Sequence, residues 1–348
     1  MKKIRVLVVD DSALVREILT HGLVQDPGIE VVGSAPDVFV ARDKIVELEP
    51  DVITLDIEMP KMDGVEFLRR LMPQYPLPVV IVSSLSQRGK KITVEALEAG
   101  AVDFVSKPTS NIADGLTRMM QELQTKIKIA STANVSHWKF KRHPPTELRT
   151  TGSLAESTDK VIAIGASTGG TEAIIKVVEQ FPRNAPGVVI VQHMPPGFTT
   201  MYADRLNQLC KMEVKEAING DRVMQGQILL APGDYHLKVV RSGGIYKVRC
   251  TQEEKLNGHR PSVDALFNSV AEQVGNNAIG IILTGMGNDG AQGLRSMRLA
   301  GSFNIAQDEA TSVVFGMPKT AVELGAAHRI VPVDQIAFCV LDFLTRTP

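Results

Sequence analysis

The sequence predicts an α/β protein built from two doubly wound domains. Short apolar runs recur along the chain, end in small or charged residues, and alternate with stretches of helical periodicity. The length of 348 residues is enough for two domains of about 100–200 residues each. A stretch rich in Ser, Thr and Pro separates the two series of runs. We therefore expect a first domain over residues 1–129, a linker over 130–159 and a second domain over 160–346.

The composition excludes several classes of protein. Hydrophobic residues make up 44% and charged residues 22%, and the net charge is −1, so a polyanionic partner such as nucleic acid is not expected. The apolar runs are shorter than the roughly 18 residues of a membrane span, which predicts a cytoplasmic protein without membrane insertion. Cys210, Cys250 and Cys339 are scattered and predict neither a disulfide framework nor a zinc site.

Four predicted strands of the first domain end in polar side chains. They cover 4–9, 52–55, 79–82 and 104–106, with helical stretches over 13–25, 39–48, 64–72 and 92–99. The residues that follow them are Asp10, Asp11, Asp56, Ser83 and Lys107. Parallel sheets collect the carboxyl ends of their strands at one edge. This set suits Mg²⁺ held by the three carboxylates, with Ser83 and Lys107 near a phosphoryl group, and a plain acidic crevice stabilised by lysine is the alternative.

The first third of the chain resembles the response-regulator receiver domain. The resemblance rests on Asp10-Asp11, the segment from Asp56 to Gly64, Ser83, and Phe104-x-x-Lys107-Pro108, each at the end of its own strand. It implies a flavodoxin-like parallel sheet, phosphorylation of Asp56 by a histidine kinase, and Mg²⁺ on Asp11 and Asp56. It also implies a switch through Ser83, Phe104 and Lys107, because an aspartyl phosphate adds charge and acceptor oxygens.

The second domain opens on an apolar run, 161–164, that stops in Gly165-Ala166-Ser167-Thr168-Gly169-Gly170. Gly165-x-Ser167-x-Gly169 fits the pattern in which a nucleophilic serine is exposed on a tight turn between a strand and a helix. A glycine-rich loop whose Ser and Thr only cap the next helix explains this stretch equally well.

Two further apolar runs lead to a histidine and an aspartate. Residues 188–191 precede His193, and residues 279–283 precede Asp289. If the three strands are parallel neighbours, His193 accepts the Ser167 proton and Asp289 fixes the imidazole tautomer. The start of the helix near Thr168 then supplies N–H groups for an oxyanion. Taken alone, His193 is more typical of a residue that bonds a carbonyl at a strand end.

The glycine loop before Asp289 offers a different function. Gly285-x-Gly287-x-x-Gly290 fits a dinucleotide-binding fingerprint, with Asp308 at nearly the expected distance. A carboxylate at Asp289 would repel the pyrophosphate, which disfavours this alternative of a receiver-controlled dinucleotide-binding enzyme. A regulator without enzymatic activity is a further class, but the sequence has no basic recognition helix.

Two other polar residues have structural interpretations. His236 lies in the segment 235–240, which is predicted to form a hairpin with 245–249. Ser262 precedes a predicted helix over 265–274 and is typical of an N-cap.

The second domain resembles the chemotaxis protein-glutamate methylesterase family (CheB). The resemblance rests on 165–170, Gln192-His193-Met194-Pro195, 259–264, 284–290 and Phe315-Gly316-Met317-Pro318. It implies an esterase domain with a mostly parallel sheet and an antiparallel hairpin, a triad of Ser167, His193 and Asp289, and oxyanion donors from the backbone of Thr168 and Met286.

The resemblance to this family also implies a substrate and a reaction. The resemblance implies hydrolysis of glutamate γ-methyl esters on methyl-accepting chemoreceptors, deamidation of receptor glutamines, and activation when Asp56 is phosphorylated. It implies Mg²⁺ in the receiver and no cofactor in the esterase site. The three residues occur along the chain in the order Ser, His, Asp, which differs from the order in α/β-hydrolases. The turn motif therefore does not predict the α/β-hydrolase fold for this domain.

Overall fold

The computed structural model describes residues 2–60, 62–108, 112–140 and 159–346. The chain divides into two compact units, Met1–Arg142 and His143–Pro348, which are described separately. Most of the predicted linker, 141–158, lies outside the described residues. Within the described parts, every helix is too short or too polar to cross a membrane.

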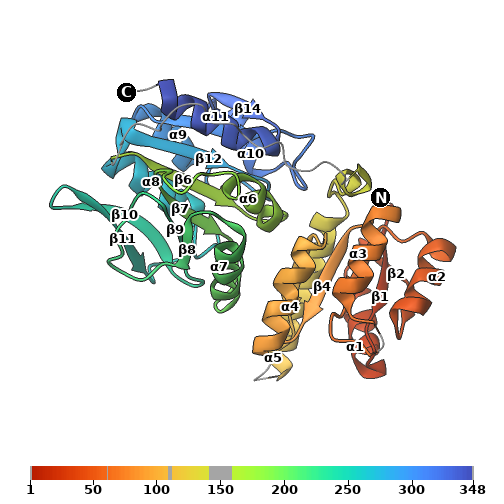
Figure 1. Cartoon of the computed structure of the whole chain (residues 1–348). Coiled ribbons are helices and arrows are strands. Elements are labelled where there is room, and N and C mark those ends of the chain that lie inside the picture. The colour runs from red at the N-terminus through yellow and green to blue at the C-terminus, as the bar shows by residue number, and fades with distance from the viewer. Residues whose placement is uncertain (1, 61, 109–111, 141–158, 347–348) are drawn as a thin grey trace. The chain divides into compact units, whose positions relative to one another are not determined.

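The first unit is a five-stranded parallel sheet with helices on both faces (Figure 1). The strand order is β2-β1-β3-β4-β5, with β1 Ile4–Val9, β2 Ile29–Ala35, β3 Val52–Leu55, β4 Val79–Ser83 and β5 Asp103–Ser106. The helices are α1 Ala13–Leu23, α2 Val38–Leu48, α3 Gly64–Gln74, α4 Gln87–Glu98 and α5 Ile112–Ala130. The sequence prediction omitted β2, an edge strand with several half-buried positions that lacks the continuous apolar run of the other strands.

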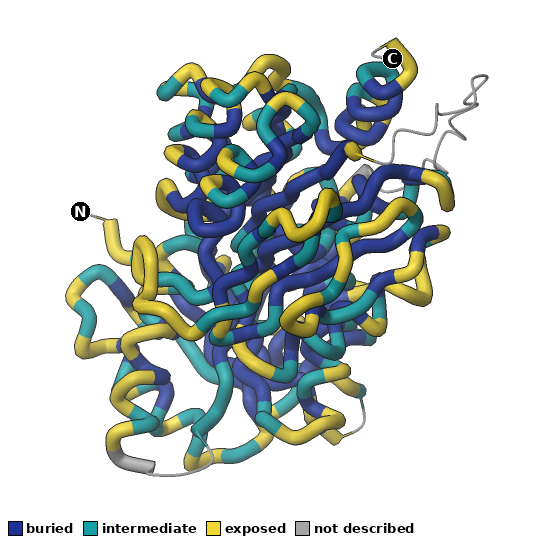
Figure 2. Tube along the Cα trace, turned by 90° about the vertical axis from the view of Figure 1, so that its left-hand side faces the viewer, coloured by how far each residue is buried: buried dark blue, intermediate teal, exposed yellow. Residues whose placement is uncertain are grey.

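Short polar side chains start the helices of the first unit. Ser12, Asp37, Asp63 and Ser86 are N-caps whose side chains accept backbone N–H groups of α1, α2, α3 and α4. Of the strands, β1, β3 and β4 are buried along most of their length, whereas β2 is mostly half-buried. Buried stretches of the chain are dark blue in Figure 2. Each helix therefore begins directly after a buried strand or a short loop, which leaves the polar strand ends at one edge of the sheet.

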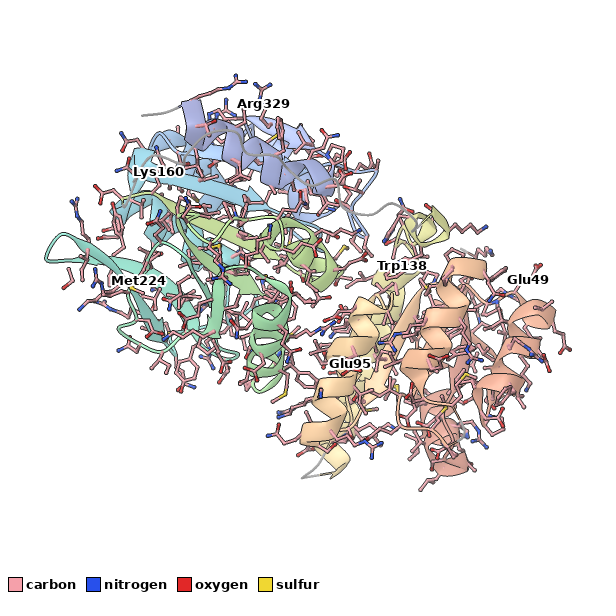
Figure 3. All side chains as sticks on the ribbon, viewed as in Figure 1. Glu49, Glu95, Trp138, Lys160, Met224 and Arg329 are labelled. Atoms are coloured by element: carbon pink, nitrogen blue, oxygen red, sulfur yellow. The ribbon has the colours of Figure 1, made fainter. Side chains whose placement is uncertain are left out.

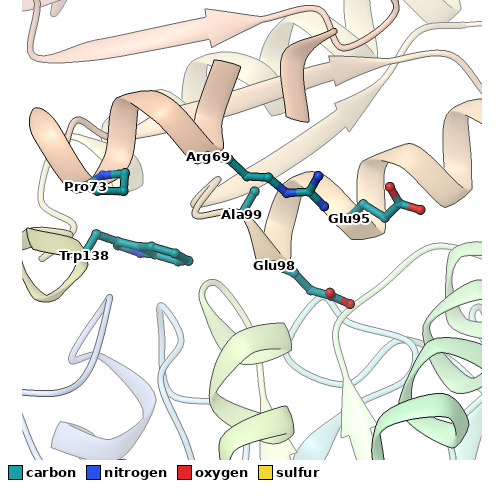
Figure 4. A pocket seen from close by; sticks show the side chains of 6 residues that line it. All are labelled: Arg69, Pro73, Glu95, Glu98, Ala99 and Trp138. Carbon is teal, nitrogen blue, oxygen red and sulfur yellow. The ribbon is translucent and has the colours of Figure 1, made fainter. Parts of the chain in front are cut away.

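The start of the predicted linker belongs to the first unit. A short 3₁₀ helix, η1 Ser136–Phe140, packs against α3, and its Trp138 is only 7% exposed (Figure 3). Trp138 lines a pocket together with Pro73 and Ala99 (Figure 4). Gly100 has a φ of +115°, and a Cβ there would stand 3.0 Å from the indole. Glycine at position 100 therefore allows both the positive φ of the backbone and the close packing of the indole.

The second unit contains a seven-stranded parallel sheet and a separate antiparallel hairpin. The predicted mostly parallel sheet and hairpin are confirmed, although the sequence located only three of the seven sheet strands. The order is β14-β13-β12-β6-β7-β9-β8, with β6 Val161–Ala166, β7 Gly187–Gln192, β8 Glu213–Glu216, β9 Gln227–Leu230, β12 Ala278–Ile282, β13 Phe303–Gln307 and β14 Arg329–Val331. The hairpin pairs β10 His236–Ser242 with β11 Ile245–Thr251. The helices are α6 Gly170–Val178, α7 Phe198–Leu209, α8 Val263–Gln273, α9 Ala291–Leu299, α10 Met317–Glu323 and α11 Val333–Arg346.

The register of the three central strands positions the candidate site. Gly165 in β6 is paired with Val191 in β7 on one side and with Ile282 in β12 on the other. All three strands are fully buried, so their carboxyl ends meet at the same sheet edge. Ser167, His193 and Asp289 follow these three strand ends.

Gly165 allows the strand that precedes Ser167 to pack against α8. A Cβ at Gly165 would stand 2.1 Å from Cγ1 of Val263. We expect Gly165→Ala to lower the free energy of unfolding by about 1–3 kcal/mol, because a close-packed core accommodates an extra methyl group poorly. Urea unfolding of the full chain measures this loss.

Val263→Ala supplies the matched control, because it removes the methyl groups that the new side chain meets. In the double variant, the second substitution is expected to cost less than it does in the wild type. Strict additivity of the two losses would contradict the proposed clash.

Candidate active site

His193 connects Ser167 and Asp289 at the carboxyl edge of the second sheet. Its Nδ1 lies 3.2 Å from Oγ of Ser167, and its Nε2 lies 2.8 Å from Oδ2 of Asp289. The His193 side chain is 8% exposed and that of Asp289 is 1% exposed, whereas Ser167 is half-buried. The structure thus brings together the three residues that the sequence predicted.

The charge of Asp289 determines the tautomer of His193. Burial alone would raise the pKa of Asp289, but hydrogen bonds and the charge of His193 outweigh it and hold the pKa well below its usual range. An ionised Asp289 accepts a hydrogen bond, so Nε2 of His193 carries the proton and Nδ1 offers its lone pair to Ser167. The two ring nitrogens therefore have the opposite assignment to the serine protease triad, in which Nε2 faces the serine.

Asp289 is surrounded by donors from the segment 257–264, which leads into the first turn of α8. Its Oδ1 accepts from Asn257 Nδ2 at 2.9 Å, Ser262 Oγ at 2.8 Å and Asp264 N at 3.2 Å. Its Oδ2 accepts from Val263 N at 2.7 Å in addition to His193. The carboxylate is therefore ionised in a buried place because donors replace its water.

The turn after β6 exposes Ser167 instead of using it as a cap. Helix α6 begins at Gly170, and its N-cap Gly169 has a φ of +74° without a side-chain cap hydrogen bond. The capping interpretation of Ser167 is therefore wrong. The main chain of Ser167 donates from N to the carbonyl oxygen of Thr284 at 3.0 Å.

The loop after β12 packs directly against the serine. A Cβ at Gly285 would stand 2.7 Å from Cβ of Ser167, so only glycine fits there. Met286, the next residue, is 49% exposed, and Thr284 Oγ1 donates to the carbonyl oxygen of Thr168 at 3.0 Å. The main chains around Thr168 and Met286 thus flank Ser167 from two loops.

A second imidazole covers the first. The rings of His259 and His193 stack with centroids 3.8 Å apart and planes 11° apart. Burial, and to a smaller extent the charge of the neighbouring His193, lowers the pKa of His259 to about 4. His259 is therefore neutral at neutral pH and supports the His193 ring without adding charge to it.

In the first unit, Lys107 is held between two carboxylates. Its Nζ lies 2.9 Å from Oδ2 of both Asp10 and Asp56. Burial alone would lower the pKa of Lys107, but its hydrogen bonds and charge interactions with Asp56 and Asp10 outweigh burial and raise it. Burial raises the pKa of Asp10. Ligand oxygens of Asp10, Asp11 and Asp56 lie within 4.8 Å of one another, which fits a hard cation with oxygen ligands.

Ser83 and Phe104, the other predicted switch residues, are buried on the neighbouring strands. The hydroxyl of Ser83 accepts from Thr93 Oγ1 at 2.6 Å. Phe104 is 4% exposed, and the ammonium group of Lys126 lies 5.1 Å from its ring centroid. Both side chains have defined partners in this conformation.

Comparisons with known proteins agree with this arrangement. The CheB methylesterase family model matches residues 162–340, and the response regulator receiver domain model matches residues 6–125. The chain belongs to the CheB methylesterase family. A protein-glutamate methylesterase/protein-glutamine glutaminase of Syntrophotalea carbinolica is 66% identical over 348 residues, 99% of each chain. One from Sulfurimonas denitrificans is 52% identical over the same share of each chain.

A solved structure supports the fold of the second unit. The Thermotoga maritima CheB methylesterase catalytic domain is 38% identical, with a TM-score of 0.52, and the match covers 53% of this chain and 99% of that one. The comparisons give no support to a dinucleotide-binding enzyme. In the structure, the glycine loop directs Asp289 toward His193, and Asp308 accepts hydrogen bonds from Thr311.

The structural interpretations of His236 and Ser262 are confirmed. His236 bonds the carbonyl oxygen of Glu254 through Nε2, and its Nδ1 accepts from the main chain of Ser262. Ser262 is the N-cap of α8, as predicted, and it also donates to Asp289. The sequence reasoning missed that second role, and it missed Asn257 and the stacking of His259.

We expect His259 to make stability sensitive to moderately acidic pH. An imidazole whose pKa falls from 6.5 to about 4 on folding binds protons more readily in the unfolded chain. Its contribution is present above pH 6.5 and is lost as the pH falls through about 4. Calorimetric melting of the full chain across this range tests the expectation.

The comparison protein is His259→Phe, which keeps an aromatic ring but does not titrate. Asp10 and Asp264 have raised pKa values and act in the opposite sense, but they are the same in both proteins. The melting temperature of the variant should therefore fall less on acidification. Parallel curves for the two proteins would contradict the assignment.

Proposed function

We propose that this chain is a phosphorylation-activated serine esterase that hydrolyses glutamate γ-methyl esters on methyl-accepting chemoreceptors and deamidates receptor glutamines. The observation that carries the proposal is the chain of hydrogen bonds from Ser167 Oγ through His193 to Asp289, 3.2 Å and 2.8 Å long. The names of the full-length relatives supply the substrate class. The protein would act in the cytoplasm, where receptor signalling domains and a histidine kinase are accessible.

In the first half of the reaction, Ser167 Oγ attacks the ester carbonyl carbon and its proton passes to His193 Nδ1. The imidazolium that forms is stabilised by Asp289 through Nε2. Collapse of the tetrahedral intermediate breaks the bond to the methoxy oxygen, and His193 returns the proton so that methanol leaves. Ser167 is then esterified by the glutamyl group.

In the second half, water replaces methanol. His193 Nδ1 takes a proton from the water, whose oxygen attacks the acyl carbon, and the proton then passes to Ser167 Oγ as glutamate is released. Backbone N–H groups of Thr168 and Met286 are proposed to hold the oxyanion in both halves. With a glutamine substrate the leaving group is ammonia, and the same steps produce glutamate.

The first unit supplies control. We propose that a histidine kinase phosphorylates Asp56 and that Asp10, Asp11 and Asp56 hold the Mg²⁺ required for this transfer. When bound, the metal neutralises charge on the phosphoryl oxygens. Lys107, already 2.9 Å from Asp56, is positioned to bind the new phosphoryl group, and Ser83 and Phe104 would rearrange with it.

Removing the nucleophile tests the chemistry. Ser167→Ala should reduce methanol release from methylated receptor by about 10⁴-fold or more, because no other group forms the acyl intermediate. Asp289→Asn should lower the rate strongly as well, since an amide facing Nε2 no longer favours the proton there. A cooperative melting transition in each variant shows that it folds. A fully active Ser167→Ala would overturn the mechanism.

Phosphorylation is tested separately with a small phosphodonor. Wild-type protein with acetyl phosphate and Mg²⁺ should release methanol faster than protein without the donor, because a phosphate on Asp56 shifts the receiver equilibrium. Asp56→Asn should keep the basal rate and lose the increase. An equal increase in Asp56→Asn would place the phosphorylation site elsewhere.

A further inference from the structure

One amide side chain lies between two carboxylates beside the proposed triad. Nδ2 of Asn257 is 2.9 Å from Oδ1 of Asp289 and 2.7 Å from Oδ2 of Asp264. Both neighbours are acceptors, so the amide must present its two N–H groups to them. Asn257 therefore hydrogen-bonds two buried acidic groups that would otherwise face each other without a donor between them.

The second carboxylate fixes the loop that carries Asp289. Asp264 Oδ1 accepts from Gly293 N at 2.6 Å, in the first turn of α9, which begins two residues after Asp289. Burial, and to a smaller extent the charge of Asp289, raises the pKa of Asp264. The amide of Asn257 thus links the Asp289 carboxylate to a side chain anchored on the start of α9.

The backbone at Asn257 also determines where His259 lies. Asn257 and Gly258 have φ values of +53° and +80°, and Leu256 and His259 exchange hydrogen bonds of 3.2 Å and 2.9 Å across them. Positive φ at both central residues is typical of a type I′ turn, for which Asn-Gly is the preferred pair. The turn places His259 at the end of the bridge, where its ring stacks on His193.

We propose that Asn257 is a positioning residue for ester hydrolysis: its amide holds Asp289 with Oδ2 toward His193, and its turn lays His259 against the His193 ring. This inference rests on the proposed roles of Ser167, His193 and Asp289. Asn257 does not touch the reacting atoms. Its contribution is to hold the carboxylate and the base in the geometry that proton transfer requires.

Two substitutions that tolerate the left-handed backbone separate the amide from the turn. Asn257→Gly keeps the turn and removes the amide, and should lower kcat by about 10-fold with KM within about 2-fold of wild type. Asn257→Asp keeps the shape but places a third carboxyl group against Asp264 and Asp289. Asp289 also interacts with the titratable side chains of His193 and His259, and Lys255 acts on His259.

The pH dependence distinguishes positioning from a general loss of structure. At about pH 8 the Asn257→Asp protein should be slower than Asn257→Gly, because three carboxylates in contact repel one another. The gap should narrow toward about pH 6, as the introduced carboxyl takes up a proton and becomes a donor. The assay is methanol release by the full chain from methylated receptor in the presence of acetyl phosphate.

Asn219→Asp is the matched control. Asn219 is exposed and precedes a glycine, as Asn257 does, but its side chain accepts from Cys250 N instead of donating to Asp264 and Asp289. This variant should have the wild-type kcat at each pH. Wild-type kcat in Asn257→Gly, or a pH-independent ratio between the two Asn257 variants, would overturn the inference. An active Ser167→Ala would instead overturn the proposed triad, so the two failures are distinguishable.

Discussion

The catalytic unit depends on one buried charge. Asp289 is 1% exposed, and removing a carboxylate from water costs several kcal/mol unless donors replace the solvent. Five donors do so, and four of them come from the segment 257–264. The path of that segment, the N-cap of α8 and the orientation of His193 are all consequences of satisfying this carboxylate.

The first unit uses the same physical constraint with the charges reversed. Lys107 is a half-buried cation, and Asp10 and Asp56 neutralise it at 2.9 Å each. In the second unit the balance is fixed, because main-chain and neutral donors surround Asp289. In the first unit the balance is open to change, since a phosphoryl group on Asp56 would alter the charge that Lys107 faces. The two units therefore differ in what surrounds the charged group. Neutral donors hold Asp289 in the second unit, whereas carboxylates that can change their charge hold Lys107 in the first.

The sequence predicted most of the polar side chains that follow the strands, but few of the contacts that loop residues make with distant parts of the chain. Continuous apolar runs and the polar residues after them are local signals, so Ser167, His193 and Asp289 could be placed at one sheet edge before the structure was known. The half-buried edge strand β2 lacked that signal. Asn257 and His259 were missed because their contacts are with residues far along the chain, although the Asn-Gly pair is itself a local turn signal.

The strand order has a consequence for how the site is assembled during folding. β6 and β7 are close in sequence, so the serine and the histidine can meet after a short loop closes. β12 must return to the other side of β6 after β7, β8, β9 and the hairpin have been made. A nascent chain would therefore hold the proposed nucleophile and base before it has the carboxylate proposed to orient them. Esterase activity would require the long-range pairing of β12 with β6, which is among the last strand pairings that the chain order allows. The appearance of enzymatic turnover would therefore mark a late step in the folding of this domain.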